Sequence, residues 1–392
     1  MGKIELDHTG SGSGITLSSD GTSLLLGGTA IGGGGGSDPD LYAENYTTGT
    51  QPATTGTNAV AIGKGSSAAG TEAIAMVDGT ADSQDSFAVG GIVQSAIGGY
   101  AIGKSAQVYS QYGLALGQSA LVSAASYGTA VGYQAVAGAN SAVGLAKSRA
   151  SGADSLAGAI ANNPTSYGAS GAGAVALMNY AKASGSSSGA FGFGANATNW
   201  GACALGAQTF ATGDSSVSLG RNSLASATYS ICIGNAGQNN IQSSIKFSGS
   251  QHANQGDAQI GLYPLMADTT DATATAMVTN HQTTPGAGTA NQIVLPNNSA
   301  YAFHGTIVAR QSAAQGTASA AWKIEGLIRR EGSAGTTVLV NSATTVLDNT
   351  PSWGMALSAD TTNGGLKVQV TGAASTNIRW ITSITTSELT YA

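Results

Sequence analysis

The stretch Asn58-Ala-Val-Ala-Ile-Gly-Lys-Gly-Ser-Ser-Ala-Ala-Gly70 decides the fold, because its first half recurs along the chain. The recurring pattern is apolar, small, apolar, glycine, and it returns in phase between about residues 59 and 234. Most copies lie 12–16 residues apart, with one longer step across 159–178, where Asn162-Asn163-Pro164 indicates a loop insertion. A period near fourteen residues is too short for a helical hairpin repeat or a propeller blade. It predicts a coil of two short strands and two turns.

Each copy combines an apolar anchor with the glycine that follows it. Side chains of a strand alternate between its two faces, so we expect the anchors on one face and small residues on the other. We expect the anchors to be buried, and each glycine to supply a turn that can require a positive φ. The anchors are Ile62, Val89, Ile102, Leu116, Val131, Val143, Phe193, Leu205, Leu219 and Ile233. The turn glycines are Gly63, Gly90, Gly103, Gly117, Gly132, Gly144, Gly158, Gly194, Gly206, Gly220 and Gly234.

A single stack of such coils is expected to be under-stabilised. Ordering the backbone of every residue costs conformational entropy. Two anchors in each coil return only part of that cost when they are buried. Packing several identical stacks around an axis would bury the second face, so the repeat predicts self-association.

Composition excludes several classes of protein. Of 392 residues 58 are glycine, 9% are charged and 42% are hydrophobic, and the net charge is −6. Disordered chains are less hydrophobic and more highly charged, and collagen places glycine at every third position. Nucleic-acid binding needs clustered Lys and Arg, which this mildly acidic chain lacks. No apolar run reaches the length of a membrane span, so we expect neither a nucleic-acid partner nor membrane insertion.

The repeat resembles the head repeat of trimeric autotransporter adhesins, which also occurs in bacteriophage fibre proteins. The resemblance rests on residues 58–70 and their in-phase copies, and covers about 175 residues. It implies a left-handed parallel β-roll wound as a homotrimer. The chain departs from the autotransporter pattern, since it shows no signal peptide, no membrane anchor and no heptad stalk. We therefore expect a virion fibre assembled in a host cytoplasm.

The two ends differ from the repeat. Residues 1–50 are rich in glycine and resemble the segments that dock phage fibres on the particle, with short strands expected at Ile4-Glu-Leu, Ile15-Thr-Leu and Leu24–Leu26. Residues 51–237 form the predicted roll and residues 238–255 a connector. Residues 256–392 predict an all-β, jelly-roll-like sandwich and resemble a C-terminal phage-fibre domain around 291–299, 321–330 and 357–365. Its nine expected strands are 258–266, 273–279, 291–295, 301–311, 319–330, 336–341, 353–359, 365–371 and 376–389.

Catalytic and metal-binding patterns are weak. The four histidines lie far apart with no ligand spacing, so we expect no metal, and the glycine runs lack the context of a nucleotide site, so we expect no cofactor. Cys203 and Cys232 occupy different phases of their repeats and are expected to face opposite ways. The carboxylates that glycan cleavage would need are better explained as turn residues; they are Asp257, Asp268, Asp271 and Asp360.

Aromatic residues offer the remaining candidate site. Fibre tips stack aromatic rings against sugars, and Tyr301 and Trp353 lie near predicted turns or strand ends, although packing in the core also explains both. The sequence therefore predicts a non-enzymatic homotrimeric virion fibre on tail, neck or head. Its N-terminus would bind other virion proteins, and its C-terminal domain would bind a host-surface glycan or protein. A polysaccharide-degrading tailspike, a bacterial surface adhesin and a purely structural decoration stay open as alternatives.

Overall fold

The structure is a computed structural model that describes residues 50–391 apart from 124–125, 160–165, 282–290 and 349–352, together with the backbone of four strands before residue 50. The described residues are all β except for one short 3-10 helix at Ala334–Thr336. They form two units, Met1–Asp154 and Ser155–Ala392. Among these residues no helix has the length and apolar character needed to cross a membrane. The all-β prediction is confirmed.

The N-terminal strands form a small antiparallel sheet. Strand β1 (Ile4–Leu6) pairs with β2 (Ile15–Ser19), β2 with β3 (Leu24–Leu26), and β3 with β4 (Thr29–Ala30). The three short strands expected here are therefore present. The role of this segment in docking stays a prediction.

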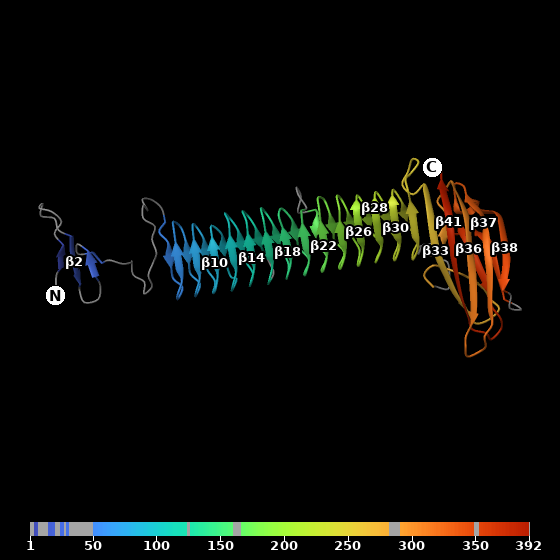
Figure 1. The fold of residues 1–392 in the computed structure, drawn as a ribbon, viewed down its shortest axis with the longest axis horizontal. Coiled ribbons are helices and arrows are strands. Elements are labelled where there is room, and N and C mark those ends of the chain that lie inside the picture. The colour runs from blue at the N-terminus through green and yellow to red at the C-terminus, as the bar shows by residue number, and fades with distance from the viewer. Residues whose placement is uncertain are drawn as a thin grey trace. The chain divides into compact units, whose positions relative to one another are not determined.

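The first unit contains a parallel roll. Its coils alternate a three-residue long strand with a two-residue short strand, and each kind of strand pairs with its equivalent in the next coil (Figure 1). The long strands are β6 (Val60–Ile62), β8 (Ile74–Met76), β10 (Phe87–Val89), β12 (Tyr100–Ile102), β14 (Leu114–Leu116), β16 (Thr129–Val131) and β18 (Val143–Leu145). The short strands are β5 (Ala53–Thr54), β7 (Ser67–Ala68), β9 (Thr80–Ala81), β11 (Ile92–Val93), β13 (Gln107–Val108), β15 (Leu121–Val122), β17 (Val136–Ala137) and β19 (Arg149–Ala150).

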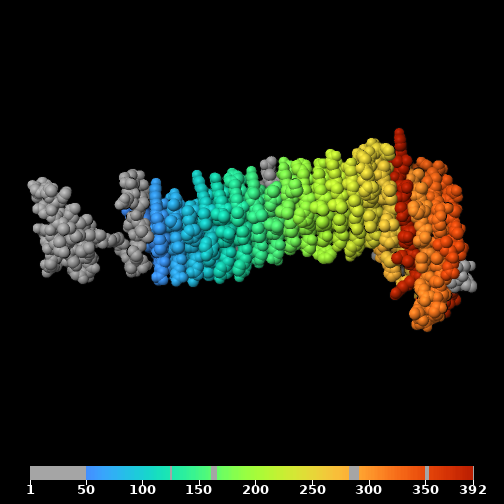
Figure 2. All heavy atoms as spheres, in the orientation of Figure 1, coloured from blue at the N-terminus to red at the C-terminus, as the bar shows by residue number. Residues whose placement is uncertain are grey.

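The second unit begins with the same arrangement. Its coils pack directly on one another in the sphere view (Figure 2). The long strands are β20 (Leu156–Gly158), β22 (Val175–Leu177), β24 (Gly189–Phe191), β26 (Cys203–Ala207), β28 (Val217–Arg221), β30 (Ile231–Asn235) and β32 (Ile245–Ser248). The short strands are β21 (Gly168–Ala169), β23 (Lys182–Ala183), β25 (Asn196–Ala197), β27 (Phe210–Ala211), β29 (Leu224–Ala225) and β31 (Gln238–Asn239). The repeat therefore builds a parallel β-solenoid.

The interior of each coil is filled by small residues. The middle residue of the long strand points inward, and Ala75, Ala115 and Ala204 have no exposed surface. The anchors point outward instead, so the expectation that they are buried within the coil is wrong: Leu116 remains 41% exposed and Leu205 44%. The inward residue of the short strand is also small or medium-sized, as at Ala68, Val108 and Ala211, which have no exposed surface.

Nine predicted turn glycines lie in the left-handed region. Their φ values are positive because the chain turns sharply between a long strand and the next short strand. They are Gly63, Gly90, Gly103, Gly117, Gly132, Gly194, Gly206, Gly220 and Gly234.

Three copies have a different register from the one predicted. Gly144 pairs with Ala130 and so fills the coil interior, which makes Val143 the first strand residue and moves the anchor to Leu145. Gly158 pairs with Leu177 and so takes an anchor position itself. In these glycine-rich copies more than one frame fits the sequence pattern, and the hydrogen-bonded register selects between them.

The copy near residue 190 is displaced by two residues. Phe191, rather than Phe193, pairs with Leu205, and Gly192 rather than Gly194 follows the strand, with a φ of 135°. Phe193 is 47% exposed at the turn. The sequence Phe-Gly-Phe-Gly repeats its own motif, which is why the pattern alone could not fix the frame.

Substitution of Gly206 tests how tightly the turns of successive coils stack. Its φ is 127°, and a Cβ built there would lie 1.8 Å from the carbonyl oxygen of Gly220 in the next coil. We expect Gly206→Ala to lower the free energy of unfolding by about 1–3 kcal/mol, the usual cost of one strained backbone position, with the clash adding to it. Thermal unfolding followed by circular dichroism measures the change. Gly249→Ala is the control, since nothing lies within 4 Å of a Cβ at Gly249; equal loss in both variants would contradict the stacking.

The roll extends beyond its predicted end. Residues 238–255 are not simply a connector, because β31 and β32 complete another coil and Ile245 pairs with Ile231. Lys246 takes the inward position that a small residue fills elsewhere, and Ser248 pairs with Gly234. These two replacements hide the last copy of the repeat from a pattern search.

The C-terminal domain consists of two antiparallel sheets. The large sheet joins the roll directly, because β32 pairs with its first strand, β33. The large sheet has the order β33 (Ala258–Thr269), β41 (Ile378–Thr390), β36 (Ser299–Gln311), β37 (Ser319–Arg330) and β38 (Val338–Asp348). The small sheet contains β34 (Ala274–Ala276), β40 (Gly365–Thr371), β35 (Ile293–Val294) and β39 (Gly354–Asp360). All nine predicted strands are present, whereas the jelly-roll-like connection stays a prediction.

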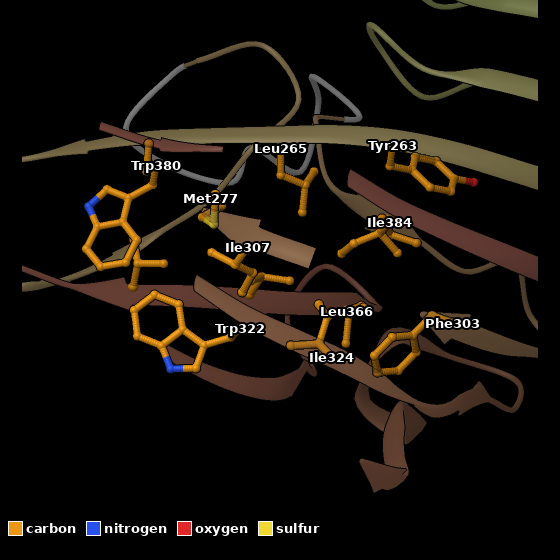
Figure 3. Close-up of a cluster of buried hydrophobic side chains, with 14 of the residues drawn as sticks. Tyr263, Leu265, Met277, Phe303, Ile307, Trp322, Ile324, Leu366, Trp380 and Ile384 are labelled. Atoms are coloured by element: carbon orange, nitrogen blue, oxygen red, sulfur yellow. The ribbon is translucent and has the colours of Figure 1, made fainter. Parts of the chain in front are cut away.

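The core of this domain contains the large side chains that the roll excludes. Trp322 stacks on Trp380 with 5.9 Å between ring centroids, and Ile307, Ile324 and Leu366 lie beside them (Figure 3). The predicted alternation along 319–330 and 376–389 puts Trp322, Ile324 and Trp380 on the inward face. The domain therefore has a conventional hydrophobic core.

Candidate functional site

The two aromatic residues predicted to contact a receptor are buried. Tyr301 is 1% exposed on the inward face of β36, and Trp353 is 7% exposed with its ring 5.9 Å from that of Trp380. Their assignment as receptor contacts is wrong. Strand alternation places Tyr301 inside, and packing on Trp380 accounts for Trp353.

A buried polar network occupies the junction of the roll and the large sheet. The ammonium group of Lys246 lies 3.1 Å from the carboxylate of Glu388, and both side chains are almost fully enclosed. Gln259 donates to the same carboxylate at 2.9 Å and Thr386 at 2.8 Å, and the Tyr263 hydroxyl also donates to it. This enclosure leaves no access for a ligand, so the network ties the last coil to the domain.

Two tyrosines in this region remain neutral. Burial raises the pKa of Tyr263 well above its usual range, and the adjacent Glu388 carboxylate raises it further. The same two causes raise the pKa of Tyr301. Both hydroxyl groups therefore keep their protons and can act as donors toward Glu388.

Three of the four carboxylates considered for glycan cleavage hold turns together. Asp257 accepts backbone N–H bonds from His252, Ala253 and Asn254 at 2.7–2.9 Å. Burial alone would raise the pKa of Asp257, but these donors outweigh it and the pKa lies below its usual value. Asp360 behaves in the same way, and the Thr273 N–H lowers the pKa of Asp271. A glycosidase general acid needs a raised pKa, so these residues do not suit that role.

The fourth carboxylate belongs to a charged cluster on the outward face of the large sheet. Asp268 near the end of β33 pairs in register with Arg379 on β41, and Arg379 pairs with Arg310 on β36. His281 lies beside them, with its Nε2 atom 3.1 Å from Oδ2 of Asp268. We call Asp268, His281, Arg310 and Arg379 the Arg310–Arg379 cluster.

The two arginines of the cluster are only partly neutralised. Arg379 is 90% exposed, and its Nε atom lies 3.9 Å from Oδ1 of Asp268. The Arg310 guanidinium donates to the carbonyl oxygens of Thr317 and Ala318 rather than to a carboxylate. Like charges directly opposite each other destabilise a sheet, so this arrangement has an electrostatic cost that an anion would remove.

Two hollows meet at the cluster. One has a volume of about 590 Å³ and is bordered by Thr270, Gln311 and Asn377. The other, about 510 Å³, has an apolar wall that includes Met266, Val308 and Ile381. Both share Asp268, Arg310 and Arg379, and both fall in the size range of small-molecule sites. This is the candidate binding site.

The cysteines and the other histidines lie apart from the cluster. Cys203 points outward and Cys232 inward, as expected from their phases, and both are free. His304 and His252 are exposed away from the cluster, and His8 lies outside the described residues. No group of three or more His, Cys, Asp or Glu side chains gathers within the described part of the chain.

Comparison with known proteins agrees with the repeat pattern found in the sequence of the roll. Two stretches match the YadA head domain repeat. They are residues 55–76 and 211–236, one in each unit of the structure. These two stretches of the roll are therefore similar to the YadA head repeat. A search of curated proteins finds no match.

Two solved structures resemble the chain. One is the tailspike protein gp49 from Acinetobacter baumannii bacteriophage Fri1, a capsular polysaccharide depolymerase, with 11% identity, a TM-score of 0.24, and coverage of 81% of this chain and 59% of that one. The other is the Acinetobacter baumannii phage AM24 tailspike protein, with 9% identity, a TM-score of 0.19, and coverage of 81% and 62%. The chain thus spans about three fifths of these tailspikes.

Proposed function

We propose that the chain is a homotrimeric virion fibre whose C-terminal domain attaches to a host surface. The observation that carries this proposal is the outward position of the large apolar residues of the roll. The first and third residues of each long strand form what we call the outer ladder. In the second unit this ladder includes Leu177, Phe191, Leu205, Leu219, Ile233, Ile245 and Phe247.

The outer ladder has the character of an interface. Leu205 is 44% exposed and Phe247 50%, whereas alanines fill the interior of the coil. The outward face of the short strands is mixed, with Lys182, Asn196 and Gln238 among its residues. Contiguous apolar surface marks an interaction site, so sister copies are expected against the long-strand face. The resemblance to trimeric adhesin heads supplies the number three.

The apolar surface continues into the C-terminal domain. Ile245 pairs with Leu262 and Phe247 with Ile260, and both partners are exposed. A hollow of about 370 Å³ lies at this junction and is lined by Tyr229, Leu262 and other residues. A neighbouring copy that contacts the ladder would also cover this junction.

Attachment rather than cleavage is proposed for the C-terminal domain. Three copies of the Arg310–Arg379 cluster would bind repeated surface groups, and multivalency raises weak affinities without new contacts. The lowered pKa values of Asp257, Asp271 and Asp360 argue against these three carboxylates as the general acid of a glycosidase. Residues 1–50 would dock the fibre on other virion proteins, and the fibre would assemble in the host cytoplasm.

Binding to isolated cell-surface polysaccharide tests this function. The full chain is incubated with polysaccharide from candidate host strains, and both retention and oligosaccharide release are measured. We expect retention by one strain type with no release. Release of oligosaccharides would replace the proposal with the tailspike alternative. Absence of an antibody label for residues 256–392 from virions in electron microscopy would reject the virion assignment.

A further inference from the structure

We propose that the Arg310–Arg379 cluster binds a sugar unit that carries a carboxylate, such as a uronic acid. This inference rests on the proposed function and specifies its ligand. It assigns the site to an acidic surface glycan rather than a neutral one. Asp268, Arg310 and Arg379 share one transverse row of the large sheet, which brings them together from three strands.

The charge balance of the cluster favours an anion. Arg310 on β36 and Arg379 on β41 are directly opposite each other in register, and Asp268 on β33 is opposite Arg379. Arg379 extends into solvent and makes its only ion pair, among the described residues, at 3.9 Å. A guanidinium forms two parallel hydrogen bonds with a carboxylate, which suits this exposed arginine. A ligand carboxylate between the arginines would also remove their mutual repulsion.

The remaining surface of the site favours a sugar over a bare ion. Met266, Val308 and Ile381 form an apolar wall next to the arginines, and Val308 and Ile381 are about half exposed. The C–H face of a pyranose ring packs on such a wall. Met266 pairs with Ile381, and Ile381 pairs with Val308, so these three residues form one transverse row of the sheet. This apolar row lies two residues along each strand from the charged row, on the same face.

Polar groups around the site match sugar hydroxyls. The Asp268 carboxylate is oriented by His281 and Arg379 and still has acceptor capacity. Gln311 and Asn377 are among the residues that line the larger hollow. The site thus offers arginines to a carboxylate, an apolar wall to a sugar ring and polar groups to hydroxyls. Together these features fit an acidic monosaccharide within a polymer.

Binding of glucuronic acid to the full chain tests the proposal. Isothermal titration calorimetry compares glucuronic acid, glucose and inorganic phosphate at low salt. We expect glucuronic acid to bind at least about tenfold more tightly than glucose, because a charge-assisted pair is added. We also expect its affinity to fall as salt screens the arginines.

Two variants locate the site. Arg379→Gln is expected to weaken glucuronic acid binding about tenfold. Arg329→Gln is the matched control, because Arg329 is an exposed arginine on the same sheet that contacts Glu331 at 3.9 Å. It is expected to leave the affinity unchanged. Circular dichroism of both variants confirms that the fold is kept.

Three results would overturn the assignment. They are equal binding of glucose and glucuronic acid, unchanged binding in Arg379→Gln, and phosphate binding as tight as that of glucuronic acid, which would show an anion site only. The proposed function fails separately, if the full chain is monomeric or is not retained by any host polysaccharide. A chain that binds host polysaccharide normally with Arg379→Gln keeps the function and loses only this site.

Discussion

Replacing Lys246 by methionine is expected to lower the free energy of unfolding by about 3–5 kcal/mol, since it leaves a buried charge without its partner. Glu388 would keep its hydrogen bonds from Gln259, Thr386 and Tyr263, but it would lose the ammonium group 3.1 Å away. Urea unfolding of the full chain measures the change. The loss is expected in the transition of the C-terminal domain, because Glu388 lies in β41.

A surface ion pair supplies the control. Lys323 lies 3.3 Å from Glu325 with both side chains about half exposed, so Lys323→Met is expected to cost only about 0–1 kcal/mol. Adding Glu388→Gln to Lys246→Met removes the isolated charge and is expected to restore most of the stability. If Lys246→Met costs no more than Lys323→Met, the buried pair does not hold the junction.

Replacing Leu219 by aspartate is expected to abolish the trimer. Leu219 is 37% exposed at the third position of β28, in line with Leu205 and Ile233. At the proposed interface the aspartate would be desolvated in all three copies at once and close to its own symmetry mates. Burying an unpaired charge costs several kcal/mol per ion. Light scattering on the purified variant measures the loss of the trimer.

The matched control lies on the other face of the roll. Phe210 is 38% exposed on the short strand β27, within the coil that precedes Leu219. Phe210→Asp is expected to leave the trimer intact, because the short-strand face is not the proposed interface. Loss of the trimer in Phe210→Asp but not in Leu219→Asp would reverse the assignment of faces.

The repeat made most of the fold predictable. Alternation along Val60-Ala61-Ile62 and its copies defines the strands, and the glycines that follow mark the turns. Period alone does not say which face is inside. The interior positions of the coils hold mainly alanine, with some valine as at Val108, whereas anchors such as Leu116 lie outside. Alternation alone therefore predicts the wrong side for the anchors.

The strand register is ambiguous in some copies of the repeat because they are rich in glycine. At Gly144 and around Phe191 two glycine frames fit the pattern, and only the register with the next coil selects one. The last coil was missed because Lys246 breaks the small-residue rule. That exception has a physical cause, since its partner Glu388 arrives from the far end of the sequence.

The candidate site was hardly visible in the sequence. The sequence pattern offers Asp268 only as a turn residue and His281 only as one of four scattered histidines, and no motif contains Arg310 or Arg379. Strand order explains this, because β41 inserts between β33 and β36 and so brings Arg379 between Asp268 and Arg310. The one available signal was that both arginines occupy outward positions of amphipathic strands. Tyr301 and Trp353 failed because aromatic character alone does not separate a core from a surface.

The mass of the unmodified chain in solution tests the central claim most directly. Sedimentation equilibrium at micromolar concentration is expected to give three times the 38.3 kDa of one chain, with no dissociation on dilution. The outer ladder would then be buried between copies. A stable, folded species of 38.3 kDa would contradict the account, because the large apolar residues of the roll would have no partner.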